Sequence, residues 1–304
     1  MATVQGEVAV AAALGSAARY SARRRRIAVA LLVGPAVLLV GGALLVPAAN
    51  LLVQSFLESQ GYGTLTYHFT FSNYVDALRD PVYRTVAWHS FALGAAAALI
   101  CVAAAYPVAF FVTFRLRRAR NLALFLVVVS LFTSYLVRLY AWYTIFGENG
   151  VVNAALKRLG LISHPLLFLL FSRTTVLIAF VNVFLPYAIL MITSAMQNVR
   201  SDLLENARDL GASPLRAFSR VVLPLTMTGA IGAFTYTFIL TSGDYITPAL
   251  LGGTSGSTSL ANIVSENFVA LGNRPAGAAI SFVMLLIFFG VYLALTRLER
   301  FKGI

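Results

Sequence analysis

Charged residues are scarce in this chain of 304 residues: they make up 11% of the sequence, whereas 59% is hydrophobic. A soluble domain of this length needs a charged exterior, so this composition, with a mean hydropathy of +0.82, indicates a membrane protein. The formal net charge of +12 does not point to nucleic acid, because the basic residues collect in short segments between apolar runs and form no continuous stripe.

The sequence also has few of the residues that enzymes and metal sites need. Its two lysines, Lys157 and Lys302, do not follow a glycine, and no G-x-x-x-x-G-K-[ST] phosphate-binding motif occurs. Three histidines and the single cysteine, Cys101, are widely dispersed, which argues against a metal site and excludes an internal disulfide. No G-x-S-x-G nucleophile motif is present. We therefore expect neither an enzyme nor a bound cofactor, and if ATP drives this protein, another chain binds it.

Six uncharged apolar runs are each long enough to cross about 30 Å of hydrocarbon as a helix. The first, Ile27–Leu57, follows a cluster of arginines; a signal peptide has the same pattern, but its apolar core is only about 7–15 residues long. The others are Thr85–Phe114, Asn121–Val137 continuing past Arg138, Thr174–Asn198, Val221–Gly243 and Pro275–Thr296. We predict an all-α integral membrane protein with six transmembrane helices and no strand-rich domain.

The distribution of arginine and lysine predicts which segments lie on which side of the membrane. Four segments contain most of the twenty-three basic residues. There are five in the N-terminal segment, four in the Arg115–Arg120 loop, four in the loop around Glu205 and three in the tail Arg297–Lys302. The positive-inside rule places these segments in the cytoplasm and the other loops outside. We predict, in order, a cytoplasmic tail over residues 1–26, a first transmembrane helix over 27–57, a core of five transmembrane helices over 85–297 with a cytoplasmic loop at 198–224, and a cytoplasmic tail over 298–304.

The loop between the fourth and fifth runs, Asn198–Pro224, has a detailed local pattern. Asp202 is a candidate N-cap, and Glu205 three residues later would complete a capping box. Four apolar residues then share one helical face: Leu203, Leu204, Ala207 and Leu210. Gly211 is placed to end this helix in a left-handed turn, and Ser213-Pro214 starts a second one. Two short helices joined at an angle form a surface to which a partner protein can bind.

Glu205-Asn206-Ala207, then Gly211 four positions after the alanine, then Leu223-Pro224, resembles the EAA loop of ABC-importer permeases. The sequence departs from the family at Asn206, where alanine is usual, and asparagine lowers helix propensity slightly. The resemblance implies a coupling helix that docks into a groove on a cytoplasmic ATPase, with these residues and Asp202 as its site. The alternative is that Glu205 only caps a helix in an ordinary cytosolic loop, and both can hold at once.

Two further segments resemble the spermidine/putrescine branch of these permeases, and the similarity runs from about residue 65 to 297. They are Val137–Trp142, with Glu148-Asn149-Gly150 after it, and Gly243–Gly253. The resemblance implies the type I, MetI-like permease fold in a bacterial cytoplasmic membrane. It also implies three kinds of partner: a second permease that is homologous or identical, two ATP-binding subunits and an extracytoplasmic substrate-binding protein. The implied solute is a polyamine, although related branches carry other small solutes.

Ionisable residues near the membrane are few, so each one is informative. Arg138, toward the outer end of the third span, either reaches the outer headgroups or pairs with an acidic group or a docked binding protein. Asp244, at the outer end of the fifth, either holds a cation beside the rings of Tyr245 or Trp142, or caps the next turn or pairs with Arg138. In the fourth span, Asn182 is expected as a buried amide bonded to a neighbouring helix.

Aromatic residues and a proline complete this set of candidates. Trp88, Tyr140, Trp142 and Tyr143 fit an aromatic belt at the outer interface. Pro186 allows a bend in the fourth span that could serve as a gate element. The predicted pathway residues are Arg138, Trp142, Asn182, Asp244 and Tyr245.

Two other classes of protein explain less of the sequence. An ion-coupled secondary transporter would want an acidic relay inside the spans, yet no aspartate or glutamate lies within the six runs. A membrane-anchored scaffold leaves the spacing of Glu205, Gly211 and Pro224 unexplained. The sequence therefore favours a translocation subunit that a separate ATPase drives.

Overall fold

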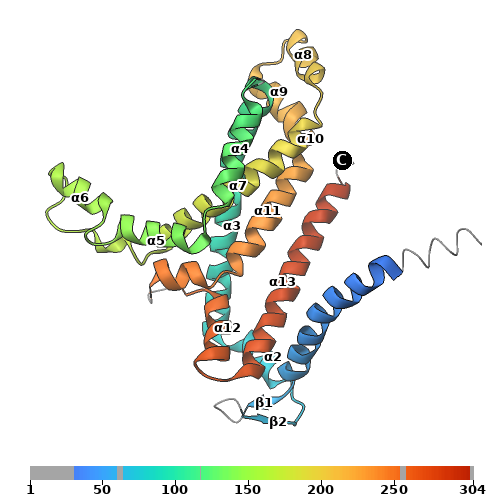
Figure 1. Cartoon of the computed structure of the whole chain (residues 1–304), viewed down its shortest axis with the longest axis vertical. Helices are drawn as coiled ribbons and strands as arrows, with labels where there is room; N and C mark the ends of the chain where they lie inside the picture. Colours follow the sequence, from blue (N-terminus) through green and yellow to red (C-terminus); the bar gives the residue numbers. More distant parts are fainter. Residues whose placement is uncertain (1–30, 60–63, 117, 254–257, 302–304) are drawn as a thin grey trace, which may run out of the picture. The chain divides into compact units, whose positions relative to one another are not determined.

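The computed structural model describes residues 31–59, 64–116, 118–253 and 258–301 (Figure 1). The predicted N-terminal tail lies outside these residues. The chain divides into two units, Met1–Gln54 and Ser55–Ile304, and each is described by itself.

The described part of the first unit is a single helix, Leu31–Ser55, whose last residue begins the second unit. None of its most apolar stretch is buried inside the chain, and leucines on different faces are exposed, such as Leu32 at 81% and Leu38 at 77%. A helix that is apolar all round needs lipid or other membrane helices to cover it. The helix predicted for this run is present over its described residues.

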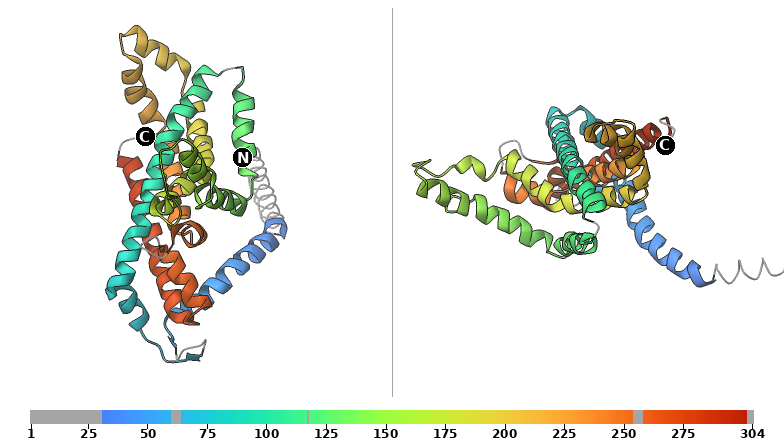
Figure 2. Two further views of the ribbon diagram at one scale, coloured as in Figure 1. Left: turned by 90° about the vertical axis from the view of Figure 1, so that its left-hand side faces the viewer. Right: turned by 90° about the horizontal axis from the view of Figure 1, so that it is seen from above.

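Three long helices form the core of the second unit: α3 (Pro81–Phe110), α7 (Arg173–Gln197) and α11 (Met227–Ser242) (Figures 1 and 2). Small side chains let α3 approach its neighbours, because Ala97, Ala98 and Ala105 are fully buried. At Gly94 an added Cβ would lie 2.1 Å from the Ser242 hydroxyl of α11. Close approach through small residues is typical of helix pairs in membranes.

The start of α3 is set by a cap that the apolar pattern alone did not reveal. The Asp80 side chain accepts a hydrogen bond of 2.7 Å from the Val82 N–H, and Pro81 occupies the first turn, where its missing N–H costs nothing. The helix therefore begins four residues before the predicted run. It continues through Pro107 and ends in a π-helical turn, η1 (Phe111–Arg115).

Two of the six predicted spans each contain a bend. Within the described residues, four helices are long and apolar enough to cross a membrane, and six spans result if each bent pair counts as one. One pair is α4 (Arg120–Leu131) and the segment Tyr135–Arg158, which begins with α5 (Tyr135–Phe146), with an 84° bend at the break. The other joins Pro214–Leu225 to α11 at 69°.

Short elements fill the connections. The hairpin β1 (Glu58–Ser59) and β2 (Leu65–Thr66) is antiparallel, and it is too small to change the all-α class. The remaining connecting elements are α2 (Ser72–Arg79), α6 (Val151–Arg158), the 3-10 turn η2 (Leu167–Leu169) and the π-helical turn η4 (Pro248–Gly252).

The segment between η4 and the last helix, α13 (Arg274–Phe301), contains a further helix, α12 (Leu260–Val269). The Ser259 hydroxyl accepts from the Asn262 N–H, and the Asn262 side chain accepts in return from the Ser259 N–H. This capping box starts α12, and Leu260 and Ile263 then pack with Ile280 of α13.

Candidate functional site

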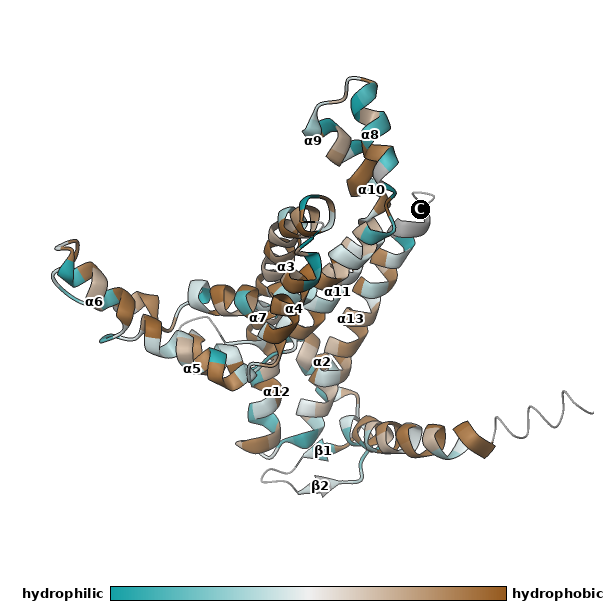
Figure 3. Ribbon diagram, turned by 45° about the horizontal axis from the view of Figure 1, so that its top comes forward, coloured by the Kyte–Doolittle hydropathy of each residue, from teal (hydrophilic) through white to brown (hydrophobic). Residues whose placement is uncertain are grey.

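The loop between α7 and α11 forms a helical hairpin. It consists of α8 (Ser201–Asp209) and α9 (Pro214–Ala217), and α9 continues through the π-helical turn η3 (Phe218–Val222) into α10 (Leu223–Leu225). Hydrophilic residues gather at α8, whereas α3 and α7 are largely apolar (Figure 3). The two short helices predicted for this loop are therefore present. We call α8 and α9 together the α8–α9 hairpin.

The first turn of α8 differs from the prediction. Arg200 occupies the N-cap position without a side-chain capping bond, and the capping box of Asp202 with Glu205 is wrong. Because the helix begins two residues earlier than expected, Asp202 already lies in its first turn, where a negative charge suits the helix dipole. Its carboxylate pairs instead with the Arg200 guanidinium at 2.6 Å. Hydrogen bonding to Arg200 lowers the pKa of Asp202, and the same bond raises the pKa of Arg200.

The end of α8 is as predicted. Gly211 has a φ of +79°, a left-handed conformation that glycine adopts without steric cost. The Gly211 N–H donates to the Arg208 carbonyl at 2.8 Å, and the Ala212 N–H donates to the Ala207 carbonyl at 3.0 Å. This pair of bonds is the Schellman motif, which satisfies carbonyls at a helix end. It fixes the direction in which the chain leaves α8.

The second helix of the hairpin also starts as predicted. The Ser213 hydroxyl accepts from the Arg216 N–H at 3.4 Å, and Pro214 occupies the first helical position. Three residues that lie close together in the sequence thus determine the angle between the two short helices: Gly211, the capping Ser213 and Pro214.

The apolar face predicted for α8 is mostly not buried within the chain. Leu204 is 6% exposed and packs inward, but Leu203 is 40% exposed and Leu210 is 89% exposed. Glu205 and Asn206 are exposed, and Ala207 is half-buried. The hairpin therefore presents both leucines and charged side chains outward, a mixture that is typical of the surfaces that partner proteins cover.

Leu223 and Pro224 lie apart from Glu205, at the base of the hairpin where the 69° bend occurs. The bend is anchored by Thr226, which is fully buried. Its hydroxyl donates to the Val222 carbonyl at 2.8 Å and lies 3.2 Å from the Tyr106 hydroxyl of α3. Sequence reasoning missed both Thr226 and Tyr106. Thr226 had a local signal, because it follows Pro224 by two residues. Tyr106 had none, because its role depends on a contact with a residue 120 positions away.

A second cluster of polar groups lies where α11 ends. Asp244 Oδ1 accepts from the Ile246 N–H at 2.9 Å, and Oδ2 accepts from the Thr247 N–H at 3.3 Å and from its hydroxyl. The hydroxyl of Tyr135, the first residue of α5, also donates to Oδ2. The Ser259 hydroxyl donates to the Asp244 carbonyl at 3.0 Å. Asp244 therefore caps the next turn, as one of the two interpretations predicted, and joins α5, α11 and α12.

Arg138 lies just after the break between α4 and α5, and it does not pair with Asp244. Its guanidinium donates to the backbone carbonyls of Ser130, Thr133 and Val183, the latter two at 3.1 Å and 3.4 Å. Carbonyls in the last turn of a helix have no partner within that helix, so a cation there is stabilised by both hydrogen bonds and the dipole. The pairing with Asp244 is wrong, and Arg138 instead stabilises the bend.

The other predicted pathway residues do not form one cluster with these. Trp142 stacks on Phe146 with ring centroids 5.1 Å apart. The Tyr245 side chain is 48% exposed, and its carbonyl accepts from the Asn262 amide at 2.8 Å. Asn182 is exposed on α7, so it is not a buried amide within this chain. Helix α7 also continues through Pro186 without a break.

Taken together, the bent apolar helices and the exposed helical hairpin define an integral membrane permease of the ABC-importer class. The sequence matches the family described as binding-protein-dependent transport system inner membrane component over residues 104–303, and the chain belongs to this family. It is a translocation subunit and not an enzyme, and it is a multi-pass membrane protein.

Curated relatives are similar over most of their length. The chain is 34% identical to the spermidine/putrescine transport system permease protein PotB of Haemophilus influenzae, over 84% of this chain and 90% of that protein. It is 31% identical to the PotB protein of Escherichia coli (strain K12), over 84% of this chain and 91% of that protein.

Solved structures show the same fold at lower identity. A chain of a bacterial ABC transporter involved in the import of the acidic polysaccharide alginate matches with a TM-score of 0.74 and 15% identity, over 92% of this chain and 98% of that one. A chain of the MetNI methionine ABC transporter matches with a TM-score of 0.54 and 16% identity, over 73% and 97%. These likenesses show the ABC-importer permease fold, and the predicted fold class is confirmed.

Proposed function

We propose that this permease subunit imports a polyamine of the spermidine or putrescine type. The observation that carries the proposal is the similarity to two PotB proteins, at 34% and 31% identity, across 84% of this chain. Import of another small solute by the same machinery is the second candidate, because a solved structure with the same fold belongs to a methionine ABC transporter.

The complete importer in this proposal has the partners that the family fold requires. A second, homologous permease forms the other wall of the pathway, two ATP-binding subunits lie on the cytoplasmic side, and a substrate-binding protein docks on the outside. The basic segments at both ends of the chain and around Glu205 support an orientation with both termini and the α8–α9 hairpin in the cytoplasm.

The α8–α9 hairpin is the proposed contact for the ATP-binding subunit. Glu205 and Asn206 are exposed, and so is the neighbouring Leu210 at 89%, so these side chains are free to enter a groove on that subunit. The Schellman motif at Gly211 keeps the two short helices at a fixed angle. Motion imposed on the hairpin therefore reaches its base without being absorbed by a flexible turn.

At that base, the bend around Pro224 and Thr226 is the proposed point of transmission. Thr226 is bonded to Tyr106, so α11 and α3 are tied together at the point where the hairpin joins them. When the ATP-binding subunits close, the hairpins of the two permeases are drawn together and the helices attached to them move as rigid bodies. The pathway then changes from open inward to open outward.

Among the predicted pathway residues, Trp142 and Tyr245 are the ones whose rings we propose to face a cation near the outer end of the pathway. Asp244 and Arg138 have a positioning role, because their polar atoms are already engaged within the chain.

Reconstitution tests the proposal. Proteoliposomes are prepared with this permease, the second permease encoded near it in the genome, the ATP-binding subunits and the binding protein. Uptake of labelled spermidine and putrescine is then measured in the presence of ATP. We expect accumulation that needs both ATP and the binding protein, and that disappears with a hydrolysis-deficient ATP-binding subunit. A complex that couples ATP hydrolysis to another solute and moves neither polyamine would contradict the substrate assignment.

A further inference from the structure

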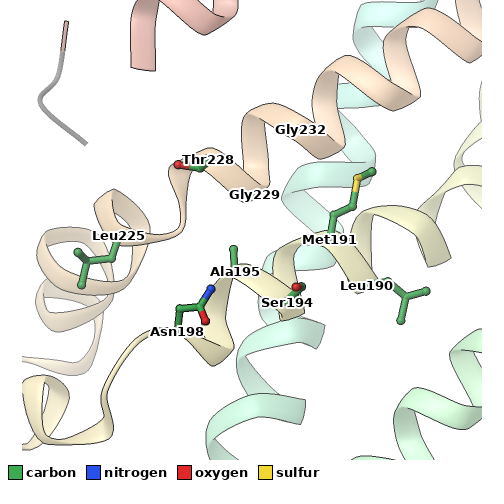
Figure 4. A pocket seen from close by; sticks show the side chains of 9 residues that line it. All are labelled: Leu190, Met191, Ser194, Ala195, Asn198, Leu225, Thr228, Gly229 and Gly232. Carbon is green, nitrogen blue, oxygen red and sulfur yellow. The ribbon is translucent and has the colours of Figure 1, made fainter. Parts of the chain in front are cut away.

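A groove of 690 Å³ lies between the last turns of α7 and the segment formed by α10 and the start of α11 (Figure 4). Its lining is uncharged and mixes apolar residues with three polar tips, Ser194 and Asn198 from one side and Thr228 from the other. In Figure 4 the side chains of Ala195 and Asn198 point from α7 toward α10 and α11. We call this space the α7–α11 groove.

Two glycines of α11 explain why the groove is there. At Gly229 an added Cβ would lie 2.4 Å from the Ala195 Cβ and 3.2 Å from the Met191 carbonyl oxygen, so the two helices are in close contact at this level. At Gly232, about one turn further along, an added Cβ would meet nothing within 4 Å. The helices are thus held together at one glycine, and the space next to the other remains open.

A pair of tyrosines lies one helical turn beyond the groove. Tyr187 precedes Met191 by four residues on α7, and Tyr236 follows Gly232 by four residues on α11, so both lie on the faces that line the groove. Their ring centroids are 5.3 Å apart with an interplanar angle of 42°. Both side chains are half-buried, so part of each ring is accessible.

The pair also lies near the middle of the membrane. Tyr187 is ten residues before the end of α7 at Gln197, which corresponds to a rise of about 15 Å. This is half of the roughly 30 Å thickness of the hydrocarbon core. A cation at this depth has lost most of its hydration, and it needs a partner on the protein.

We propose that the ring faces of Tyr187 and Tyr236 bind the ammonium groups of the transported polyamine as it passes along the α7–α11 groove. This inference rests on the proposed function. Between Arg173 and Asn198, and from Met227 to Gly243, the sequence has no acidic residue, so a carboxylate on these helices is not available to pair with the cation. Aromatic faces attract ammonium groups without a fixed negative charge.

The rest of the groove suits the same occupant. A polyamine alternates ammonium groups with short methylene chains, and the groove combines apolar side chains with the polar tips of Ser194, Asn198 and Thr228. Binding through rings and neutral oxygens is weaker than binding through a carboxylate, and a transport pathway requires that the solute can leave again.

Substitutions in the complete reconstituted importer test the pair. We expect Tyr187→Leu and Tyr236→Leu to lower ATP-dependent polyamine uptake by about fivefold to thirtyfold each, and the phenylalanine variants to stay within about twofold of the wild type. Stimulation of ATP hydrolysis by the loaded binding protein should remain, so the number of polyamines moved per ATP hydrolysed should fall. Phe234→Leu is the matched control, because Phe234 lies on the same helix and stacks on Phe238 instead.

A graded change of the ring separates cation binding from packing. Replacing Tyr236 with phenylalanines that carry one, two and three fluorines weakens the negative ring face stepwise with little change in shape. A stepwise fall in uptake supports the proposal, and equal uptake across the series overturns it. Wild-type uptake by the leucine variants also overturns it while leaving the proposed function intact. A wild-type importer that moves no polyamine refutes the proposed function and this inference together.

The groove itself is tested with a thiol. Gly232→Cys fits the open space, and it is placed in a chain with Cys101→Ala so that it is the only cysteine. We expect a small, charged methanethiosulfonate reagent to modify it in the assembled importer and to stop uptake. Modification by lipid-soluble reagents alone would assign the groove to the surface that faces lipid and would overturn the proposal.

Discussion

The α8–α9 hairpin and the junction of α5 with α11 are held together in different ways. In the hairpin, the fixed turn at Gly211 and the cap at Ser213 use bonds between residues at most five positions apart. At the junction, Tyr135 bonds to Asp244 and Arg138 to Val183, contacts that join residues 109 and 45 positions apart. The hairpin is therefore a locally determined surface element, whereas the junction exists only when the membrane helices have assembled.

The largest effect is expected where the hairpin depends on one backbone conformation. Gly211→Val should abolish ATP-coupled uptake, because a β-branched residue is strongly disfavoured at a φ of +79° and the direction of α9 would change. Gly211→Asn is the control and should retain substantial uptake, since asparagine tolerates this conformation better than other residues. Membrane insertion should be normal for both variants. Equal uptake by the two would show that the turn is not needed.

Glu205→Lys should also abolish coupled uptake, for a different reason. Glu205 is exposed and is not needed for the helix itself, so the charge reversal should disturb only the proposed contact with the ATP-binding subunit. Co-purification with that subunit should be lost, whereas thermal stability of the permease should be unchanged. A variant that retains the ATP-binding subunit and transports normally would argue against the proposed docking.

At the junction, Arg138→Met should destabilise the permease by about 2–4 kcal/mol, because three backbone carbonyls lose a charged donor inside the membrane. Thermal unfolding in detergent measures this loss. Asp244→Asn should cost less, about 1–2 kcal/mol, since asparagine keeps one of the acceptor oxygens. Uptake should fall in parallel with stability. If Asp244→Asn abolishes uptake at unchanged stability, Asp244 binds the solute and the positioning role is wrong.

The smallest effect is expected at the exposed pair of Arg200 and Asp202. The pKa of Asp202 is lowered in the folded protein, so the pair stabilises the fold above the ordinary carboxyl pKa, and this contribution is lost as the pH falls through the lowered value. Because both side chains are exposed, Asp202→Asn should leave thermal stability at pH 7 unchanged within error. A clear loss of stability would mean that the pair contributes more than its exposure suggests.

The contrast between the two regions also explains what the sequence could predict. The turn at Gly211, the cap at Ser213 and the bend-forming Pro224 have local signals, and the structure contains all three. The cap predicted at Asp202 is absent because α8 begins at Ser201, after an arginine that makes no side-chain capping bond, and Asp202 pairs with that arginine instead.

Long-range features were not predictable in the same way. The uncharged run after Asn121 has the composition of one continuous span, and its 84° bend is stabilised by Arg138, whose carbonyl acceptors include one on α7. Likewise, the contact of Thr226 with Tyr106 and the pairing of Tyr187 with Tyr236 depend on how the helices pack. Apolar composition places a segment in the membrane, but it does not specify which faces meet.

The central claim is that the α8–α9 hairpin is a cytoplasmic surface on which a separate ATP-binding subunit acts. Labelling of Leu210→Cys, in a chain with Cys101→Ala, tests it most directly, because this position is 89% exposed at the end of α8. A membrane-impermeant maleimide should label the thiol in inverted vesicles and not in intact spheroplasts, and bound ATP-binding subunits should protect it. Labelling in intact spheroplasts, or the same labelling with and without those subunits, would contradict the account.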